Sequence, residues 1–314
     1  MTFLGDLGWG DAQTDPLAGD ASARVYKRLR RGAQTAILMQ DPEGDVALFA
    51  HLARHLSGLG LSAPRILGQA EGLLLLEDLG DGLIARLANE TTEKALYLVA
   101  TDALIALHRH PAPDGLPLAS PDRLARMIDL AFLHYDDRPD LLPSAIEALR
   151  PALEDHANPA DVMVLRDYHA ENILWLPDRK GTARAGLLDF QDALQGHRAY
   201  DLVSLLEDAR RDVSAVTAEA CIRHYLTATG LPEGLFRASL AVLGAQRNLR
   251  ILGVFARLAK VRGKPHYIDL IPRVWDHLQS DLSHPALAGL RGVVAQLAVP
   301  DAVHLKRLKS CPMR

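Results

Sequence analysis

Three polar side chains near the middle of the chain, Asp167, Asn172 and Asp189, have the types and the spacing that phosphoryl transfer from ATP requires. A carboxylate can accept or orient the proton of an attacking hydroxyl group. An amide and a second carboxylate can hold Mg²⁺ against the phosphates. The sequence therefore predicts that Asp167 acts as the base and that Asn172 and Asp189 bind Mg²⁺.

Apolar runs typical of β-strands flank these residues at 162–165, 173–176 and 185–188. Each polar group is therefore expected near a strand end, where binding sites are often built. The alternative is that Asp167 and Asn172 only cap turns in an α/β domain, as these residue types often do. The combined spacing of the whole set favours a site over two unrelated caps.

The order Asp-x4-Asn, a short strand and then Asp-Phe resembles the catalytic and metal-binding loops of protein kinases. The loop begins with Asp-x-His, and no glycine follows Asp-Phe. In both respects the chain resembles the small-molecule branch, the aminoglycoside phosphotransferase-like kinases. The resemblance extends from about residue 19 to about residue 282. The resemblance implies an α+β, two-lobed protein-kinase-like fold, with a small antiparallel β-sheet lobe and a larger, mainly helical lobe.

The elements expected along the chain fit two lobes, with a boundary after residue 80. The first lobe, residues 1–80, is expected to bind the nucleotide. It contains a predicted helix at 46–57, room for a strand before residue 19, and predicted strands at 25–29, 34–40, 63–67 and 72–76. The second lobe, residues 81–314, is expected to carry the catalytic loop and the acceptor site. Its predicted helices lie at 92–110, 121–135, 143–157, 199–209, 215–229, 233–262 and 267–281.

Two segments of the first lobe lie where such kinases bind ATP. Gly19, Asp20 and Ser22 occupy the position of the phosphate-covering loop, and small residues let backbone N–H groups approach phosphate oxygens. A hairpin turn has the same composition and is the alternative. Glu77 and Leu79 close an apolar strand at the position of the adenine-binding hinge, where their backbone would bond the adenine edge. That segment also reads as a simple linker between lobes, and the two interpretations are compatible.

One feature departs from the resembled pattern. Kinases of this fold usually carry a lysine on the strand after the phosphate loop, paired to a helix glutamate, whereas this chain has Met39 at about that position. The following helix has no carboxylate beyond Asp45 at its start, so both partners are missing together. A positive charge for the phosphates must then come from elsewhere, and the nearest candidates are Arg24, Lys27 and Arg28.

Four further residues near the catalytic motif are expected to support the loop or to lie beside the metal site. The resemblance implies that His169 and Asp201 support the catalytic loop, so we expect both to be structural. Gln191 and Asp192, which follow the expected metal ligand directly, could contact the metal or the substrate.

An arginine wedge on the longest predicted helix bears on the acceptor. At about 100° per residue, Gln246, Arg247, Arg250 and Arg257 fall within a sector roughly 100° wide. On an otherwise apolar helix such a wedge is either a solvated seam or an anion pocket. Aminoglycosides are polycations, and arginines around the acceptor would repel them. Arginines suit an anionic acceptor or a neutral one that is rich in hydroxyl groups.

Four stretches together resemble the bacterial anomeric N-acetylmuramate/N-acetylglucosamine kinases of cell-wall recycling. They are the Gly-Asp-Ala-Ser start, the Leu-Arg-Asp-Tyr-His-Ala-Glu-Asn loop, Asp208-Ala-Arg-Arg-Asp212 and the helix from Gln246 to Phe255. This resemblance implies a sugar acceptor that is phosphorylated at its anomeric hydroxyl group by ATP. The arginine wedge separately suits the lactyl carboxylate of muramate. The alternatives are a phosphotransferase for another hydroxyl acceptor, such as an aminoglycoside, and a nucleotide-binding pseudokinase.

Composition bounds the partners and the compartment. The formal net charge of −4 gives no sign of a nucleic-acid-binding surface. The two cysteines, Cys221 and Cys311, lie far apart, which argues against a disulfide framework and fits a reducing cytoplasm. The chain has no start typical of a signal peptide and no apolar run long enough to span a bilayer. We therefore expect a cytoplasmic enzyme that binds neither nucleic acid nor membrane.

Overall fold

The computed structural model describes residues 3–17, 24–42 and 45–310 of the 314-residue chain. The expected phosphate loop with Gly19, Asp20 and Ser22 lies outside the described residues, as does Cys311. By packing, the chain divides into one unit of residues 1–107 and 170–192 and a second unit of residues 108–169 and 193–314. The lobe boundary after residue 80 stays a prediction, whereas the antiparallel sheet followed by a mainly helical remainder is confirmed.

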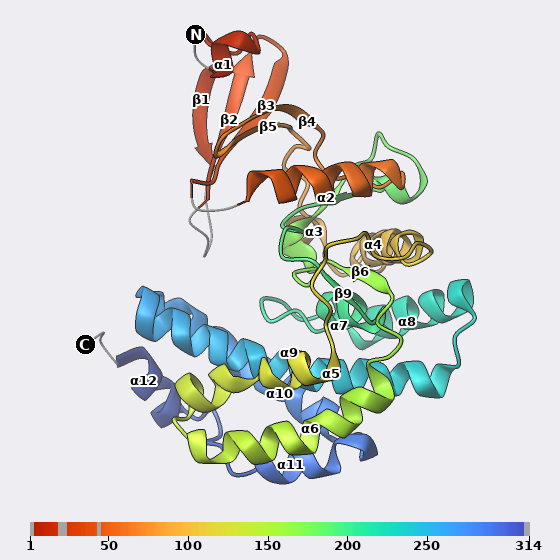
Figure 1. Cartoon of the computed structure of the whole chain (residues 1–314), viewed down its shortest axis with the longest axis vertical. Coiled ribbons are helices and arrows are strands. Elements are labelled where there is room, and N and C mark those ends of the chain that lie inside the picture. The colour runs from red at the N-terminus through yellow and green to blue at the C-terminus, as the bar shows by residue number, and fades with distance from the viewer. Residues whose placement is uncertain (1–2, 18–23, 43–44, 311–314) are drawn as a thin grey trace. The chain divides into compact units, whose positions relative to one another are not determined.

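The first unit is built on a five-stranded antiparallel sheet of strand order β1-β2-β3-β5-β4. Its strands are β1 (Gln13–Leu17), β2 (Val25–Arg31), β3 (Gln34–Gln40), β4 (Ile66–Ala70), β5 (Leu73–Glu77), β7 (Ile173–Trp175) and β8 (Ala185–Leu187), the last two forming a separate hairpin. Its helices are α1 (Phe3–Asp6), α2 (Val46–Gly58), α3 (Ile84–Leu87) and α4 (Glu93–Leu107), with 3₁₀ turns η3 (Ala170–Asn172) and η4 (Gly181–Arg184). Figure 1 shows α2 running beside β4 and β5.

The sheet is buried on both faces at its centre, which explains the run of four leucines in β5. Leu75 belongs to a core cluster with Trp9, Leu29 and Leu38, against which the leading segment with α1 packs. The strand expected at 63–67 begins only at Ile66. The physical reason is Pro64, which has no N–H group to donate to a ladder.

The second unit is mainly helical. Its helices are α5 (Pro121–Arg126), α6 (Leu142–His156), α7 (Ala199–Leu206), α8 (Ala215–Thr229), α9 (Glu233–Arg262), α10 (Ile271–Leu282), α11 (Ala288–Val294) and α12 (Ala302–Ser310). A π-helical turn η1 (Ala131–Tyr135), 3₁₀ turns η2 (Pro139–Leu141), η5 (Pro265–Leu270) and η6 (Pro285–Leu287), and a two-stranded ladder of β6 (Val162–Val164) with β9 (Leu194–Gly196) complete it. No helix among the described residues is both long enough and apolar enough to cross a membrane.

Helix α9 is the centre of the second unit. It contacts α6, α7, α10 and η1, and α10 lies along it in Figure 1. The single helix expected at 121–135 is instead α5 followed by η1. The interruption lies where the backbone of Leu130 and Ala131 approaches Gly253 of α9, since an ideal Cβ built on Gly253 would lie 2.2 Å from the carbonyl carbon of Leu130.

This close approach predicts opposite effects for two glycines of the same helix. Gly253→Ala should lower the free energy of unfolding by about 1–3 kcal/mol, because the added methyl group overpacks the contact with Leu130. Gly234→Ala is the matched control, because a Cβ at Gly234 meets nothing within 4 Å. Gly234 lies in the first turn of α9, so this change should raise stability by at most about 0.5 kcal/mol through helix propensity. Urea unfolding of both variants measures the difference, and equal stabilities would contradict the proposed packing of α9.

Candidate active site

The β7–β8 hairpin of the first unit brings the two expected metal ligands to the same end of one element. Asn172 directly precedes β7, and Asp189 is the second residue after β8. Ile173 is paired with Leu187, and the backbone N–H of Leu188 donates to the carbonyl oxygen of Asn172 at 3.0 Å. An amide and a carboxylate therefore flank adjacent ends of two paired strands, and their oxygens are ligand types that Mg²⁺ accepts in proteins.

Asp189 is held in an unusual backbone conformation. Its φ is +56°, which is uncommon for a residue other than glycine and recurs at functional sites. The next residue, Phe190, is fully buried, and its ring centroid lies 4.8 Å from that of Phe49 on α2. The side chain of Asp189 is 43% exposed. A buried aromatic anchor thus fixes the backbone while the carboxylate stays accessible.

One of the three expected basic residues contacts this carboxylate. Arg24 donates from Nη1 to Oδ1 of Asp189 and from Nε to Oδ2 of Asp41, both at 3.0 Å. Gln191 also donates to Oδ1 of Asp189, at 2.8 Å. The structure therefore brings Arg24 and Gln191 to the expected metal ligand.

The other two basic candidates have different surroundings. Arg28 forms ion pairs with Asp78 at 2.8 Å and with Asp81 at 2.9 Å, so it ties β2 to the hinge after β5. Hydrogen bonds from Arg28 lower the pKa of Asp81. Lys27 is next to Arg28 on the strand, and its side chain therefore points to the opposite face of the sheet. Met39 is 1% exposed and completes the core at the position expected for a lysine.

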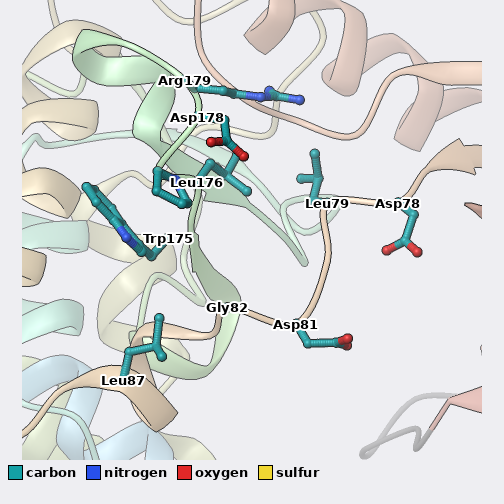
Figure 2. A pocket seen from close by; sticks show the side chains of 10 residues that line it. Asp78, Leu79, Asp81, Gly82, Leu87, Trp175, Leu176, Asp178 and Arg179 are labelled. Carbon is teal, nitrogen blue, oxygen red and sulfur yellow. The ribbon is translucent and has the colours of Figure 1, made fainter.

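The hinge segment borders a cavity of about 470 Å³ within the first unit (Figure 2). The lining comes from the hinge, from the end of α3 and from the residues that end and follow β7: Asp78, Leu79, Asp81, Gly82, Leu87, Trp175, Leu176, Pro177, Asp178 and Arg179. Leu79 is part of this lining, whereas Glu77 is not. The backbone N–H of Glu77 donates to the carbonyl oxygen of Arg65 at 2.9 Å, and its carboxylate binds Arg179 at 2.8 Å.

In the second unit, the loop that carries Asp167 is held by a buried carboxylate. Asp201, in the first turn of α7, is fully buried and accepts from the backbone N–H groups of Leu165 at 2.6 Å and Arg166 at 2.9 Å. Ser204 donates to the carbonyl oxygen of Arg166 at 3.2 Å. Arg166 has a φ of +71°, so these contacts stabilise a strained turn. The expectation that Asp201 braces the loop that carries Asp167 is confirmed by these hydrogen bonds.

His169 also matches its expected structural function. It is 7% exposed, and its Nε2 lies 3.4 Å from Nη1 of Arg210. Burial, together with the charges of Arg210 and Arg247, lowers the pKa of His169 well below its usual value. A neutral imidazole can accept a hydrogen bond from the guanidinium group, so His169 connects the loop to the segment after α7.

The arginine wedge of α9 reaches the neighbourhood of the expected base within the second unit. Burial and the charge of Arg166 lower the pKa of Arg250, whereas Tyr200, Asp167 and Asp129 raise it. Arg250 is therefore close enough to Asp167 for the two charges to interact. Further along α9, Arg257 is exposed.

Arg247 and Gln246 lie in more buried surroundings. Arg247 is 6% exposed and donates to the carbonyl oxygen of Glu207 at 3.4 Å, while Gln246 donates to the carbonyl oxygen of Leu124 at 2.9 Å. The wedge is thus divided into a buried pair near its N-terminal end and two arginines with greater exposure, Arg250 and Arg257.

A buried polar cluster beside Arg247 was not predicted from the sequence. Asn248 donates to Glu207 at 2.7 Å and to Asp281 at 3.0 Å, which connects the end of α7, α9 and α10. Burial raises the pKa of Glu207 to about 7 and that of Asp281 well above its usual value. Gly244 leaves room for the carboxylate, since an added Cβ would lie 2.7 Å from both oxygens of Asp281. No local sequence signal joins residues so far apart.

Comparison with known proteins gives a consistent picture. Residues 13–236 match the model of the phosphotransferase enzyme family. An N-acetylmuramate/N-acetylglucosamine kinase from Caulobacter vibrioides is 40% identical, with 92% of this chain and 93% of that protein covered.

Two solved structures share the fold at low sequence identity. A choline/ethanolamine kinase family protein from Mesorhizobium loti has a TM-score of 0.65 and 17% identity, covering 96% of this chain and 94% of that one. An aminoglycoside phosphotransferase from Streptomyces rimosus, solved with ADP and streptomycin, has a TM-score of 0.52 and 18% identity, covering 80% and 99%. The expected fold class is therefore confirmed by both the elements and the structural neighbours.

Proposed function

The chain belongs to the phosphotransferase enzyme family, and from this premise we propose that it transfers the γ-phosphoryl group of ATP to the anomeric hydroxyl group of N-acetylmuramate and N-acetylglucosamine. The observation that carries the proposal is the likeness, over nearly the whole chain, to the Caulobacter kinase named for these two sugars. The choice of the anomeric hydroxyl group follows from the resemblance of the four sequence stretches. The expected place of the reaction is the cell-wall recycling pathway in the cytoplasm.

Mg²⁺ fits the donor set at the end of the β7–β8 hairpin. We assign Asp189 and Asn172 as its protein ligands, and the remaining positions would be filled by phosphate oxygens and water. The accessible carboxylate of Asp189, on an anchored backbone, supports this assignment. When bound, the ion neutralises charge on the transferring phosphoryl group.

Asp167 is the proposed base. The oxygen of the sugar hydroxyl group forms the new bond to the γ-phosphorus, the bond from that phosphorus to ADP breaks, and the hydroxyl proton passes to the Asp167 carboxylate. Asp201 binds the backbone N–H of Arg166 and Ser204 binds its carbonyl oxygen, so the backbone that leads into Asp167 is fixed before the substrate binds. Asp167 and Asn172 are five residues apart, so one loop supplies both the base and a metal ligand.

For ATP, we propose that the hinge binds the adenine ring and that the first hairpin binds the phosphates. Because the N–H of Glu77 is bonded to Arg65, adenine would use the carbonyl oxygen of Glu77 and the N–H of Leu79. Arg28 supports this segment through Asp78 and Asp81. The small residues at 19–22 are proposed to cover the phosphates, and Lys27 is a further proposed phosphate contact.

For the acceptor, we propose that Arg250 and Arg257 line the sugar pocket, and that Arg247 supports them from the buried side. The electrostatic interaction between Arg250 and Asp167 supports this placement, because the acceptor hydroxyl group must meet the base. A carboxylate such as the lactyl group of muramate would gain a charge-assisted hydrogen bond from an arginine, whereas a polycation would be repelled.

The acceptor class is tested by an ADP-release screen. The purified protein should turn over ATP with N-acetylmuramate and with N-acetylglucosamine, and it should leave choline and kanamycin unphosphorylated. The 1-O-methyl glycosides are the matched controls, because their anomeric oxygen has no proton to transfer. Turnover of the methyl glycosides would contradict the anomeric position. Phosphorylation of kanamycin alone would place the protein with the aminoglycoside enzymes, and nucleotide binding without any turnover would indicate a pseudokinase.

The proposed pocket predicts a selective effect of Arg250. Arg250→Ala should reduce kcat/KM for N-acetylmuramate about 10-fold more than for N-acetylglucosamine, because only muramate loses a charge-assisted hydrogen bond. Arg257→Ala should act in the same direction. Arg262→Ala is the control on the exposed last turn of α9 and should leave both values unchanged. Equal losses of kcat/KM for the two sugars in the Arg250 variant would contradict the proposed contact between Arg250 and the lactyl carboxylate.

A further inference from the structure

Arg24 lies between two carboxylates of the first unit, and this arrangement has a consequence for metal binding. Its guanidinium group donates to Asp41, which is 8% exposed, and to Asp189, whose side chain is 43% exposed. The side chain of Arg24 is itself 14% exposed. The three side chains form a connected group, here termed the Arg24 bridge, with one buried anchor and one accessible end.

The buried end of the bridge fixes the arginine. Asp41 directly follows β3, and its backbone N–H donates to the carbonyl oxygen of Gly72 at 2.9 Å, so the carboxylate is attached to the sheet. Tyr26 is also close, because its pKa is raised by burial and lowered by the charge of Arg24. Arg24 is thus positioned by the sheet, and its contact with Asp189 at the end of the hairpin is the part that can exchange.

The contact with Asp189 sets up a competition. Arg24 and Gln191 both donate to the same oxygen, Oδ1. A divalent cation on this carboxylate would meet the guanidinium group at short range and be repelled by it. A triphosphate removes the repulsion, because its oxygens can bind the cation and the guanidinium group together.

We propose that Arg24 couples metal binding to nucleotide binding: it disfavours the bare cation at Asp189 and, when phosphates arrive, exchanges the carboxylate for a phosphate oxygen. This inference rests on the proposed nucleotide and Mg²⁺ site. It assigns a specific function to one of the three basic candidates. Arg28 is bound to the two hinge aspartates, and Met39 provides no charge on the neighbouring strand.

The proposal predicts two effects of opposite sign for one substitution. Arg24→Ala should bind Mn²⁺, used as a Mg²⁺ substitute, at least about 3-fold more tightly in the absence of nucleotide, because the competing charge is gone. The same variant should bind ADP with saturating Mn²⁺ at least about 10-fold more weakly, because a phosphate contact is lost. Isothermal titration calorimetry measures both affinities without any sugar acceptor, so the outcome does not depend on catalysis.

Two further variants make the test specific. Arg30→Ala removes an arginine of β2 that pairs with the exposed Asp15 at 2.9 Å, and it should change neither affinity. Arg24→Lys keeps the charge and should keep Mn²⁺ binding near that of the unchanged protein.

The outcomes separate this proposal from the proposed function. Weaker binding of both Mn²⁺ and ADP in Arg24→Ala would show a merely structural contact and overturn the coupling. Unchanged Mn²⁺ binding would overturn it as well. Opposite shifts in a protein that phosphorylates no sugar would support the coupling while the sugar assignment fails.

Discussion

The conformation of the loop that carries the proposed base, Asp167, depends on hydrogen bonds to the buried carboxylate of Asp201. This carboxylate accepts two consecutive backbone N–H groups, those of Leu165 and Arg166, at a point where the chain leaves β6 in a left-handed conformation. Without this acceptor, the buried N–H group of Leu165 would be unpaired, at a cost of about 1–3 kcal/mol. One side chain of α7 thus stabilises the turn that precedes Asp167.

The two residues proposed to bind Mg²⁺, Asn172 and Asp189, are positioned by strand pairing and a buried aromatic ring. Antiparallel pairing of β7 with β8 sets the register, and the buried ring of Phe190 holds the chain directly after Asp189. Ion pairs also connect elements of the first unit. Arg24, just before β2, pairs with Asp41 and Asp189, and Arg28 of β2 pairs with Asp78 and Asp81, so these two cations connect segments that are distant in sequence.

Much of this arrangement follows from local sequence. The spacing of the polar groups and the short apolar runs predicted the strands before and after the loop, and the structure contains them at Val162–Val164, Ile173–Trp175 and Ala185–Leu187. Helices α8 and α9 begin and end at the predicted residues, and both end where a glycine follows in the left-handed conformation. Local patterns of this kind need no knowledge of tertiary contacts.

What the sequence could not provide are the contacts between distant residues. The choice of Arg24 over Lys27 and Arg28 depends on a hydrogen bond that joins positions 165 residues apart. The break in the helix expected at 121–135 depends on Gly253. Helical phase placed Arg247 in the wedge, but on a helix that is buried on most sides the phase alone does not tell which neighbour a side chain meets.

In the proposed division of the chemistry, Asp167 acts on the proton and Asp189 on the metal nucleotide. Calorimetric titration of ADP in the presence of Mg²⁺ tests this most directly in Asp167→Asn and Asp189→Asn. The account predicts that Asp167→Asn binds within about 3-fold of the unchanged protein, while Asp189→Asn binds at least about 10-fold more weakly. Loss of binding in Asp167→Asn, together with normal binding in Asp189→Asn, would contradict it.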